Sequence, residues 1–305
     1  MMLRIKTPAK INLGLKILGK RIDGYHELET LFQMVDLFDH LELEERPQGI
    51  EIECATPGIP TGETNLVFRA ARLLQNDFPD RARGVRVRLT KQIPAGAGLG
   101  GGSGNAAGAL LALNVLWDLK LPREHLIPYA HKIGSDVPFF LLSPCALGRG
   151  RGELLESLQP SKKFNVVLVY PRFSVATSWV YQNLNLKLTN SENDISILRK
   201  FLCKSQFGDL GSRLFNDLEP VVTERFPVIQ SIKDALRTQG AAGCLLSGSG
   251  STVFGLFDKE NLANQAVAAL REHDWDLYLT RSVRSFSEFL PEEILDYPKS
   301  SGERS

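Results

Sequence analysis

The chain has 305 residues, 43% of them hydrophobic, and a formal net charge of +1, which suffices for a sizeable core and for two domains of typical size. A charge so close to zero gives no extended field of one sign, and this argues against nucleic acid or an anionic membrane as a partner. The longest apolar run, residues 137–142, is too short to span a bilayer, the N-terminus lacks a signal-peptide pattern, and the four cysteines lack metal-type spacing.

The first predicted element is a strand over residues 3–18. Its apolar residues Ile11, Leu13 and Leu15 share one face, whereas Lys10 and Asn12 share the other. Strand geometry therefore directs an amine and an amide into the same space. The alternative is an ordinary strand face exposed to solvent.

A turn at Asp23-Gly24 follows, and Tyr25, His26 and Phe32 lie shortly after it. On the sequence alone these aromatic residues are either core and turn residues or part of a binding surface. The elements after them are predicted in this order: strands over residues 37–45 and 49–55, an amphipathic helix over 65–78 that Thr64 or Asn65 can cap, and a strand over 85–89.

A glycine-rich stretch links that strand to a predicted helix over residues 105–119. Between Pro94 and Ala107, six of fourteen residues are glycine, which is costly because glycine loses more backbone freedom on folding than any other residue. A glycine loop that leads into a helix offers free N–H groups and the positive end of the helix dipole, and both attract phosphate. The stretch therefore predicts a polyphosphate-binding loop; the alternative is a flexible linker or a tight packing loop.

Three known types of phosphate loop fit this stretch poorly. A P-loop requires a lysine after the glycines, and none is present. Gly96, Gly98 and Gly101 match the dinucleotide pattern G-x-G-x-x-G, but Asp118, the acid at the expected distance, falls at a helix end instead of after a strand. The protein-kinase loop fails because neither His-Arg-Asp nor Asp-Phe-Gly follows.

A helix is predicted over residues 123–133, and a glycine turn then presents Asp136 beside an apolar segment that contains Pro138. This arrangement would hold a carboxylate against a desolvated wall; the alternative is that Asp136 caps a helix. Next comes Gly-Arg-Gly-Arg-Gly-Glu at residues 148–153, which on the sequence alone is an exposed basic hairpin.

The character of the chain changes near Leu155, and we expect domains over residues 1–158 and 159–290, with a disordered polar tail over 291–305. The stretch Ser-Gly-Ser-Gly-Ser at residues 247–251 joins two strands of the second domain as a long hairpin turn. The elements of this domain are predicted in this order: a strand over residues 164–170, a helical region over 215–239, strands over 241–246 and 252–257, a helix over 261–272 and a strand over 275–281.

Three separate motifs resemble those of the GHMP kinases, named for galactokinase, homoserine kinase, mevalonate kinase and phosphomevalonate kinase. In the family's order they are Pro-Ala-Lys-Ile-Asn-Leu at residues 8–13, Gly-Leu-Gly-Gly-Gly-Ser at 98–103 and Gly-Ser-Asp-Val-Pro-Phe at 134–139. The resemblance implies an α+β, two-domain fold with an N-terminal ribosomal-protein-like α/β domain and a C-terminal ferredoxin-like α+β domain. It also implies that the loop at residues 247–251 packs against the first glycine loop and that the segment at residues 148–153, which resembles the family's Gly-x-Gly-Glu segment, lines the substrate site.

The resemblance further implies roles for single residues. Lys10 and Asp136 are the expected catalytic residues, with Asp136 accepting the proton of the substrate hydroxyl. A further match, Arg-x-Asp-Gly-Tyr-His-x-Leu at residues 21–28, resembles a branch of the family whose substrate carries cytosine. The expected substrate-binding residues are Asn12, Tyr25, His26 and Phe32, with Tyr25 or Phe32 stacking on the base. The expected ATP-binding residues are Pro94, Ala95, Gly96, Ala97, Gly98, Leu99, Gly100, Gly101, Gly102, Ser103 and Gly104.

The expected partners are ATP, Mg²⁺ and a cytidine-diphosphate-linked sugar alcohol, without nucleic acid or membrane, in a cytoplasmic monomer or weak homodimer. Gly104 stands where the family usually has a second serine, so the metal ligands stay undetermined. Three other hypotheses compete: a kinase for homoserine or a mevalonate-type alcohol, an oxidoreductase that uses the G-x-G-x-x-G match, and a non-enzymatic RNA-binding module. Tyr25 and His26 argue against the first of these, and the near-zero charge argues against the last.

Overall fold

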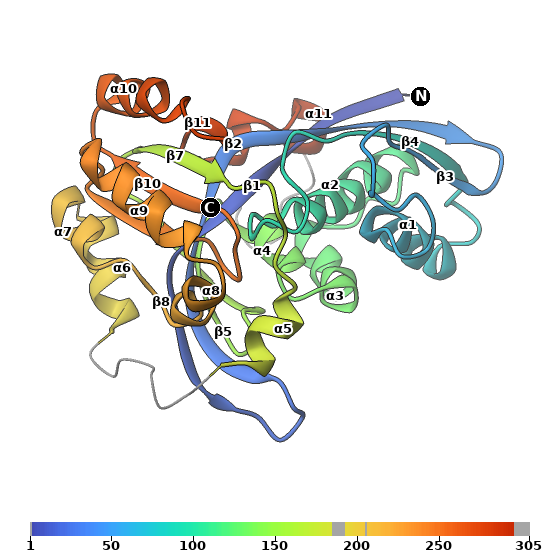
Figure 1. The fold of residues 1–305 in the computed structure, drawn as a ribbon. Coiled ribbons are helices and arrows are strands. Elements are labelled where there is room, and N and C mark those ends of the chain that lie inside the picture. The colour runs from blue at the N-terminus through green and yellow to red at the C-terminus, as the bar shows by residue number, and fades with distance from the viewer. Residues whose placement is uncertain (1, 185–192, 205, 296–305) are drawn as a thin grey trace.

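The computed structural model describes residues 2–184, 193–204 and 206–295, and in this part of the chain helices pack on two β-sheets (Figure 1). One sheet has seven strands and the other has four. The predicted α+β class is confirmed. In the described residues, none of the helices has both the length and the apolar content that crossing a bilayer requires.

The larger sheet is built around two long antiparallel strands, β1 (Met2–Lys20) and β2 (His26–Arg46), which pair along nearly their whole length. Their hairpin reaches beyond the helices at the bottom of Figure 1. The strand order is β3-β4-β2-β1-β8, and β5 pairs with β2 and with β6. The other strands are β3 (Ile50–Glu53), β4 (Gly84–Thr90), β5 (Cys145–Arg149), β6 (Leu154–Ser157) and β8 (Phe215–Asn216).

Four helices pack with this sheet around one apolar core: α1 (Leu66–Asp77), α2 (Gly101–Leu116), α3 (Arg123–Ile133) and α4 (Val137–Leu142). Asn65 caps α1 as predicted, because its Oδ1 accepts the N–H of Val67 at 2.8 Å. The Ala- and Gly-rich α2 is buried on nearly every side and packs on β1, α1 and α4. It begins within the glycine stretch, four residues before the predicted start at Asn105, so glycine backbone itself forms the first turn.

The smaller sheet has the order β11-β7-β10-β9, all antiparallel. The connection from β7 to β9 contains the helices α5 to α9 and the short strand β8, and α10 connects β10 to β11. Apart from the additional elements in the first connection, the chain follows the β-α-β-β-α-β path of the predicted ferredoxin-like domain. Its strands are β7 (Asn165–Tyr170), β9 (Gly243–Leu246), β10 (Val253–Phe257) and β11 (Asp276–Arg281). Its helices are α5 (Thr177–Gln182), α6 (Ile195–Cys203), α7 (Phe207–Ser212), α8 (Glu219–Arg225), α9 (Val228–Thr238) and α10 (Glu260–Leu270).

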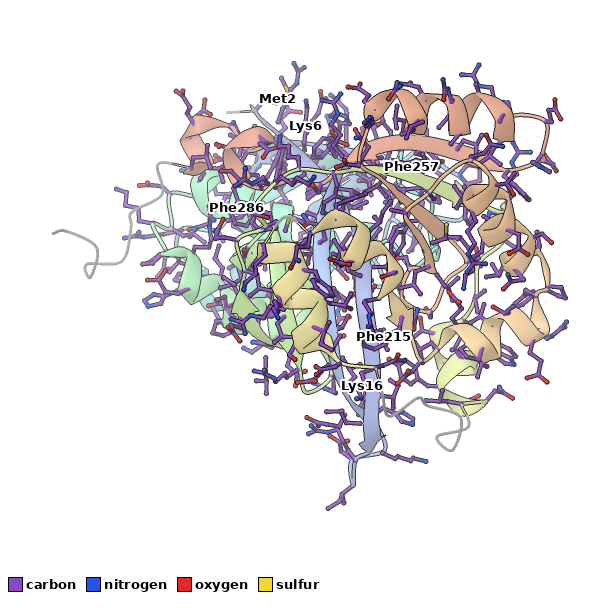
Figure 2. The ribbon with its side chains drawn as sticks, turned by 90° about the vertical axis from the view of Figure 1, so that its left-hand side faces the viewer. Met2, Lys6, Lys16, Phe215, Phe257 and Phe286 are labelled. Carbon is purple, nitrogen blue, oxygen red and sulfur yellow. The ribbon has the colours of Figure 1, made fainter. Side chains whose placement is uncertain are left out.

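The start of the helical region predicted over residues 215–239 needs correction. Residues 215–216 form β8, which pairs in parallel with β1 at Gly14 and Leu15. Phe215 accordingly lies against the long strands in Figure 2. The second half of the chain thereby adds a strand to the larger sheet, and the boundary that we predicted between residues 158 and 159 stays a prediction.

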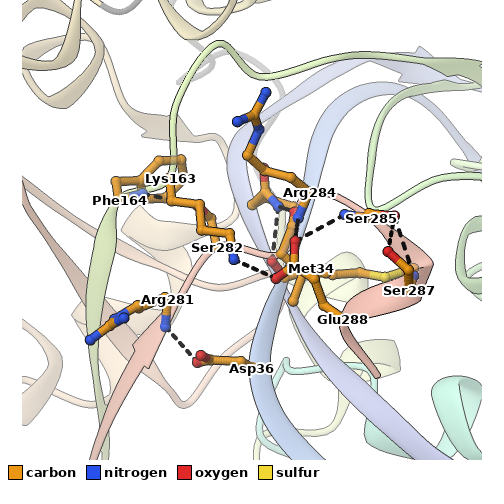
Figure 3. Close-up of polar contacts among 12 residues, drawn as sticks. Met34, Asp36, Lys163, Phe164, Arg281, Ser282, Arg284, Ser285, Ser287 and Glu288 are labelled. Atoms are coloured by element: carbon orange, nitrogen blue, oxygen red, sulfur yellow. Dashed lines mark hydrogen bonds and ion pairs between the residues drawn. The ribbon is translucent and has the colours of Figure 1, made fainter. Parts of the chain in front are cut away.

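A seam of hydrogen bonds fastens the two sheets where β11 ends (Figure 3). The N–H of Val283 donates to the Met34 carbonyl at 2.9 Å, and the N–H of Arg281 donates to Asp36 Oδ1 at 2.5 Å. Glu288, in the 3-10 helix η2 (Phe286–Glu288), accepts from Lys163 Nζ at 2.6 Å. These contacts tie β2, β7 and β11 into one body.

The chain after this seam differs from the predicted tail at 291–305. Helix α11 (Glu292–Leu295) forms there, and Ile294 is fully buried in the core of the larger sheet. The prediction of disorder is therefore wrong for residues 292–295, because one isoleucine in a polar stretch is enough to anchor a helical turn. Residues 296–305 lie outside the described residues.

Candidate active site

The motifs singled out from the sequence meet around a cavity of about 1190 Å³. Its lining comes from β1, the tip of the β1–β2 hairpin, the glycine loop, the turn before α4, helix α5 and the loop at residues 247–251. Segments that are far apart in the sequence therefore line the same cavity, and some of the candidate residues on them lie close enough to contact one another.

Lys10 and Asp136 lie together in this wall, with Lys10 Nζ 3.6 Å from Asp136 Oδ2. The Lys10 side chain is 5% exposed and that of Asp136 is 31% exposed, so the carboxylate covers the amine and remains open to the cavity. Asp136 precedes α4, yet its side chain makes no capping hydrogen bond. The capping interpretation is therefore wrong. Among the described residues that line the cavity, Asp136 is the only acid.

A short relay of hydrogen bonds holds the Lys10 amine. Lys10 Nζ donates to Asn12 Oδ1 at 2.7 Å, and Asn12 Nδ2 donates to Thr30 Oγ1 at 2.8 Å. The backbone N–H of Lys10 donates to the carbonyl of Leu99 at 2.9 Å, which joins β1 to the glycine loop. Burial lowers the pKa of Lys10, and the Asp136 carboxylate opposes this by favouring the charged ammonium.

The glycine loop leads into α2 as the sequence predicts. Gly96, Gly98 and Gly100 have φ of +65°, +77° and +67°, in the left-handed region where residues with a side chain are strained. Helix α2 begins at Gly101 with no side-chain cap, so its first N–H groups remain available to an anion. Gly102 and Ser103 of this first turn border the cavity.

Nine of the eleven residues predicted to bind ATP line the cavity, and they are Pro94, Ala95, Gly96, Ala97, Gly98, Gly100, Gly101, Gly102 and Ser103. Leu99 and Gly104 face the interior instead. Leu99 is 1% exposed in the core, and a Cβ on Gly104 would lie 2.9 Å from the Pro8 carbonyl. Both residues therefore hold the loop against β1, Leu99 through its carbonyl, which accepts the N–H of Lys10, and Gly104 through close contact of α2 with Pro8.

The loop at residues 247–251 packs directly against the first glycine loop. Ser247 Oγ donates to the Gly98 carbonyl at 2.9 Å. A Cβ on Gly98 would lie 2.0 Å from the Ser247 carbonyl oxygen, so only glycine permits this approach. A Cβ on Gly248 would lie 3.3 Å from Lys10 Nζ. The packing implied by the family resemblance is confirmed, and the segment is more than a hairpin turn.

A second buried lysine lies behind the glycine loop, and the sequence analysis missed it. Lys91 Nζ forms an ion pair with Asp39 Oδ2, which also accepts from Asn105 Nδ2 at 2.9 Å. Asp39 Oδ1 accepts the N–H groups of Gln92 and Ile93 at 2.8 and 2.9 Å. This network pins the segment that enters the loop. The only signal in the sequence is a lysine directly before the loop.

Aromatic side chains from two segments line another part of the cavity. Tyr25 is 57% exposed at the hairpin tip, and the next residue, His26, stacks on Tyr181 of α5 with ring centroids 5.1 Å apart. Burial, together with the charge of Lys20, lowers the pKa of His26, so its imidazole is neutral at neutral pH. Burial raises the pKa of Tyr181, which keeps its hydroxyl protonated. The sequence analysis missed Tyr181 because no motif surrounds it.

Phe32, also predicted to contact a base, belongs to the core, although it borders the cavity. It is 2% exposed and stacks on Phe139 with ring centroids 4.9 Å apart. Lys10 Nζ lies 5.6 Å from the centroid of the Phe32 ring. Because a base needs an open ring face, this burial favours Tyr25 over Phe32 as the stacking ring. The contact of Phe32 with substrate stays a prediction.

Comparison with known proteins gives one family over most of the chain. Residues 65–144 match the GHMP kinases N terminal domain, and residues 191–274 match the GHMP kinases C terminal family. The chain is 43% identical over 284 residues to the 4-diphosphocytidyl-2-C-methyl-D-erythritol kinase of Citrifermentans bemidjiense, a match that covers 92% of this chain and 99% of the relative. A protein of the same name from Syntrophus aciditrophicus is 44% identical over 283 residues, covering 92% and 100%.

Solved structures agree with these relatives. The crystal structure of a 4-(cytidine 5'-diphospho)-2C-methyl-D-erythritol kinase matches with a TM-score of 0.80 at 35% identity, and the match covers 92% of this chain and 99% of that one. A homoserine kinase from Cytophaga hutchinsonii matches with a TM-score of 0.72 at 21% identity, covering 92% and 95%. At 21% identity this second likeness concerns the fold alone.

Proposed function

The chain belongs to the GHMP kinase family, and we propose that it phosphorylates the 2-hydroxyl group of 4-diphosphocytidyl-2-C-methyl-D-erythritol with ATP. This reaction is a step in the methylerythritol phosphate route to isoprenoid precursors. The observation that carries the proposal is the position of Asp136. It is the one acid on the described wall of a cavity that also contains a glycine-lined helix start and the His26–Tyr181 stack.

Phosphoryl transfer asks a protein mainly for alignment and for neutralisation of charge on the phosphate oxygens. In this proposal the phosphates of ATP lie against the first turn of α2, where N–H groups and the helix dipole face the cavity. Three left-handed glycines let the backbone approach the phosphates without a side chain between them. Ser103 supplies a hydroxyl at the same place.

Asp136 and Lys10 act on the alcohol. The hydroxyl oxygen attacks the γ-phosphorus, its proton passes to the Asp136 carboxylate, and ADP leaves. Lys10, 3.6 Å from that carboxylate, stabilises negative charge that develops on the attacking oxygen. Because Lys10 is buried and tethered by Asn12, its charge is fixed in place before the substrate arrives.

Mg²⁺ accompanies ATP in this proposal. Within the described residues no three His, Cys, Asp or Glu side chains form a metal-binding group, and only one acid lines the cavity. This fits a cation that is bound mostly by phosphate oxygens and water, as Mg²⁺ often is, with Ser103 and Asp136 as the protein groups nearest to hand. Mg²⁺ would supply further neutralisation of phosphate charge.

The cytosine end of the substrate is assigned to Tyr25, His26 and Tyr181. An aromatic surface that stacks on a base contributes roughly 1–3 kcal/mol, and a neutral imidazole can hydrogen-bond to the polar edge of cytosine. A bare alcohol such as homoserine or mevalonate would leave this surface unused. We further propose a monomer or weak homodimer.

The decisive experiment is a coupled assay of ADP release. The chain is supplied with ATP and either 4-diphosphocytidyl-2-C-methyl-D-erythritol, homoserine or mevalonate, with and without Mg²⁺. We expect release only with the cytidine-linked alcohol and only with Mg²⁺. ADP release with homoserine or mevalonate but not with the cytidine-linked alcohol would overturn the substrate assignment. The oxidoreductase hypothesis is disfavoured already, because Asp118 lies in a turn that leads into α3 and no strand precedes it there.

A further inference from the structure

The turn between β5 and β6 presents Arg151 to the cavity. Its neighbours Gly150 and Gly152 have φ of +75° and +101°, and the N–H of Arg151 donates to Glu153 Oε2 at 2.5 Å. The carbonyl of Gly150 accepts the N–H of Leu28 at 2.7 Å, which fastens the turn to β2. Arg151 therefore projects from a fixed piece of backbone close to the β1–β2 hairpin.

The Arg151 side chain lies on the Tyr25 ring, with Cζ 4.8 Å from the ring centroid. Its nearest ion-pair contact is long, because Arg151 Nε is 3.8 Å from Glu153 Oε1. Arg149, two residues earlier, differs on each point. It pairs with Glu29 at 3.0 Å and is absent from the cavity lining.

The cavity needs a cation of this kind, if its substrate is the one proposed above. Of the four lysines on the described wall, Lys10 and Lys91 are already paired with Asp136 and Asp39, and Lys20 and Lys132 also border the cavity, but Arg151 is the cation that stacks on Tyr25. With cytosine at Tyr25 and the alcohol at Asp136, as proposed above, the diphosphate that joins them would lie between these two parts of the cavity wall. The planar guanidinium can donate to two phosphate oxygens at once, and stacking on an aromatic ring holds it in position.

We propose that Arg151 binds the diphosphate of the cytidine-linked substrate and that the Tyr25 ring holds its guanidinium in place. The inference rests on the proposed function and names the group by which the site separates a nucleoside diphosphate from a nucleoside monophosphate.

Calorimetric titration of CDP and CMP into wild type, Arg151→Met and the control Arg149→Met tests this. Arg151→Met should weaken CDP binding about 10- to 100-fold, the loss typical of a charge-assisted pair, and weaken CMP binding much less, so that the preference for CDP over CMP collapses. The KM for the full substrate should rise, whereas kcat and the KM for ATP should stay unchanged. Arg149→Met should behave as wild type, and Arg151→Lys should restore part of the preference for CDP.

Two outcomes would overturn the proposal. In one, Arg151→Met leaves CDP binding as it is. In the other, it weakens CDP and CMP equally, which would mean that the arginine only supports Tyr25. If Arg151→Met fails to fold, the same comparison is made with Arg151→Lys, in which an unchanged preference for CDP contradicts the proposal. Failure of wild type to bind CDP at all would count against the proposed function instead.

Discussion

Two lysine–carboxylate pairs border the same cavity, and they differ in how fully the carboxylate is satisfied. In the pair Lys91–Asp39 the carboxylate is fully buried and accepts hydrogen bonds from two side chains and two backbone N–H groups. In the pair Lys10–Asp136 the carboxylate is 31% exposed, lies 3.6 Å from the amine and makes no capping bond. The carboxylate of Asp39 is therefore saturated with hydrogen bonds from the protein, whereas that of Asp136 is largely free to accept others.

This difference indicates which pair can take part in a reaction. A carboxylate has about four lone-pair positions, and Asp39 uses them all on the protein itself. Asp136 keeps positions free for a substrate hydroxyl, while its lysine is held from the other side by Asn12. We infer that Lys91–Asp39 holds the architecture of the glycine loop and that Lys10–Asp136 acts on substrate.

The largest expected effect follows from Asp136→Asn. An amide of the same shape cannot accept the hydroxyl proton, so kcat should fall by roughly 10²- to 10⁴-fold. The free energy of unfolding should fall less than in a variant that breaks a fully buried pair, because Asp136 is 31% exposed and contributes no capping bond, and ATP should still bind through the first turn of α2. Steady-state kinetics, ATP titration and denaturant unfolding measure the three quantities. Near-normal turnover would remove Asp136 from the mechanism.

The opposite result is expected from Asp39→Asn. The new amide would turn an NH₂ group toward two donors, Lys91 and Asn105, and would leave a buried ammonium without its partner. Breaking a buried pair in this way costs about 3–5 kcal/mol of the free energy of unfolding. Denaturant unfolding should show this loss, and kcat of the remaining folded protein should stay within a few-fold of wild type.

Asp258→Asn is the control that separates the loss of stability in Asp39→Asn from the general effect of removing an aspartate charge. Asp258 pairs with Lys162 at 2.7 Å on the surface, where both side chains are about half exposed. Asp258→Asn should barely change stability, because exposed pairs contribute little. If Asp39→Asn were as stable as Asp258→Asn, the assignment of Lys91–Asp39 to architecture would fail.

The family resemblance predicted the reactive pair, with support from local sequence patterns, and the sequence analysis missed the structural pair for a physical reason. Lys10 and Asn12 share a strand face by the period of the strand, and Asp136 is marked by a glycine turn before an apolar helix. The partner of Lys91 is Asp39, which lies on β2, 52 residues away in the sequence. This pairing depends on how β2, β4 and α2 pack together, and no local sequence pattern predicts it.

The aromatic residues show the same limit. The resemblance of its motif predicts Tyr25 at the substrate, and the structure places it 57% exposed at the cavity. Phe32 could not be placed, because the pairing of β1 with β2 shifts register between Asn12 and Gly14, close to the point where Phe32 pairs with Asn12. Tyr181 contacts His26 because α5 packs near the tip of the β1–β2 hairpin. A contact between segments so far apart in the chain produces no hydrophobic periodicity that a sequence analysis could detect.

Asn12 hydrogen-bonds to Lys10 and Asn105 hydrogen-bonds to Asp39, and we expect smaller and contrasting effects on kcat and stability when each amide is removed. Asn12→Ala removes the acceptor of Lys10 Nζ at 2.7 Å, so the amine loses its orientation and kcat should fall on the order of tenfold with a modest loss of stability. Asn105→Ala removes donors to Thr7 and Asp39 and should cost about 1–3 kcal/mol of stability with kcat less affected. Kinetics and unfolding are measured on both. Equal losses of kcat and stability in the two variants would erase the distinction between the pairs.

The gentlest test uses pH and titrates Lys10 without altering the protein. Burial lowers the pKa of Lys10 from 10.5, so in the folded protein the amine loses its proton at a pH where an unfolded lysine still keeps one. Between these two values unfolded Lys10 binds more protons than folded Lys10, so this residue contributes a rise of the free energy of unfolding with pH, whereas buried Cys145 and Tyr181, whose pKa values burial raises, contribute a fall. Catalysis should move the other way, because kcat needs the charged amine and should decline through the lowered pKa. Unfolding measured across the alkaline range in wild type and in Lys10→Met isolates the contribution of Lys10, because the other titrating groups are common to both. The free energy of unfolding of wild type minus that of Lys10→Met should rise with pH. A difference that falls with pH would mean that a different group titrates there.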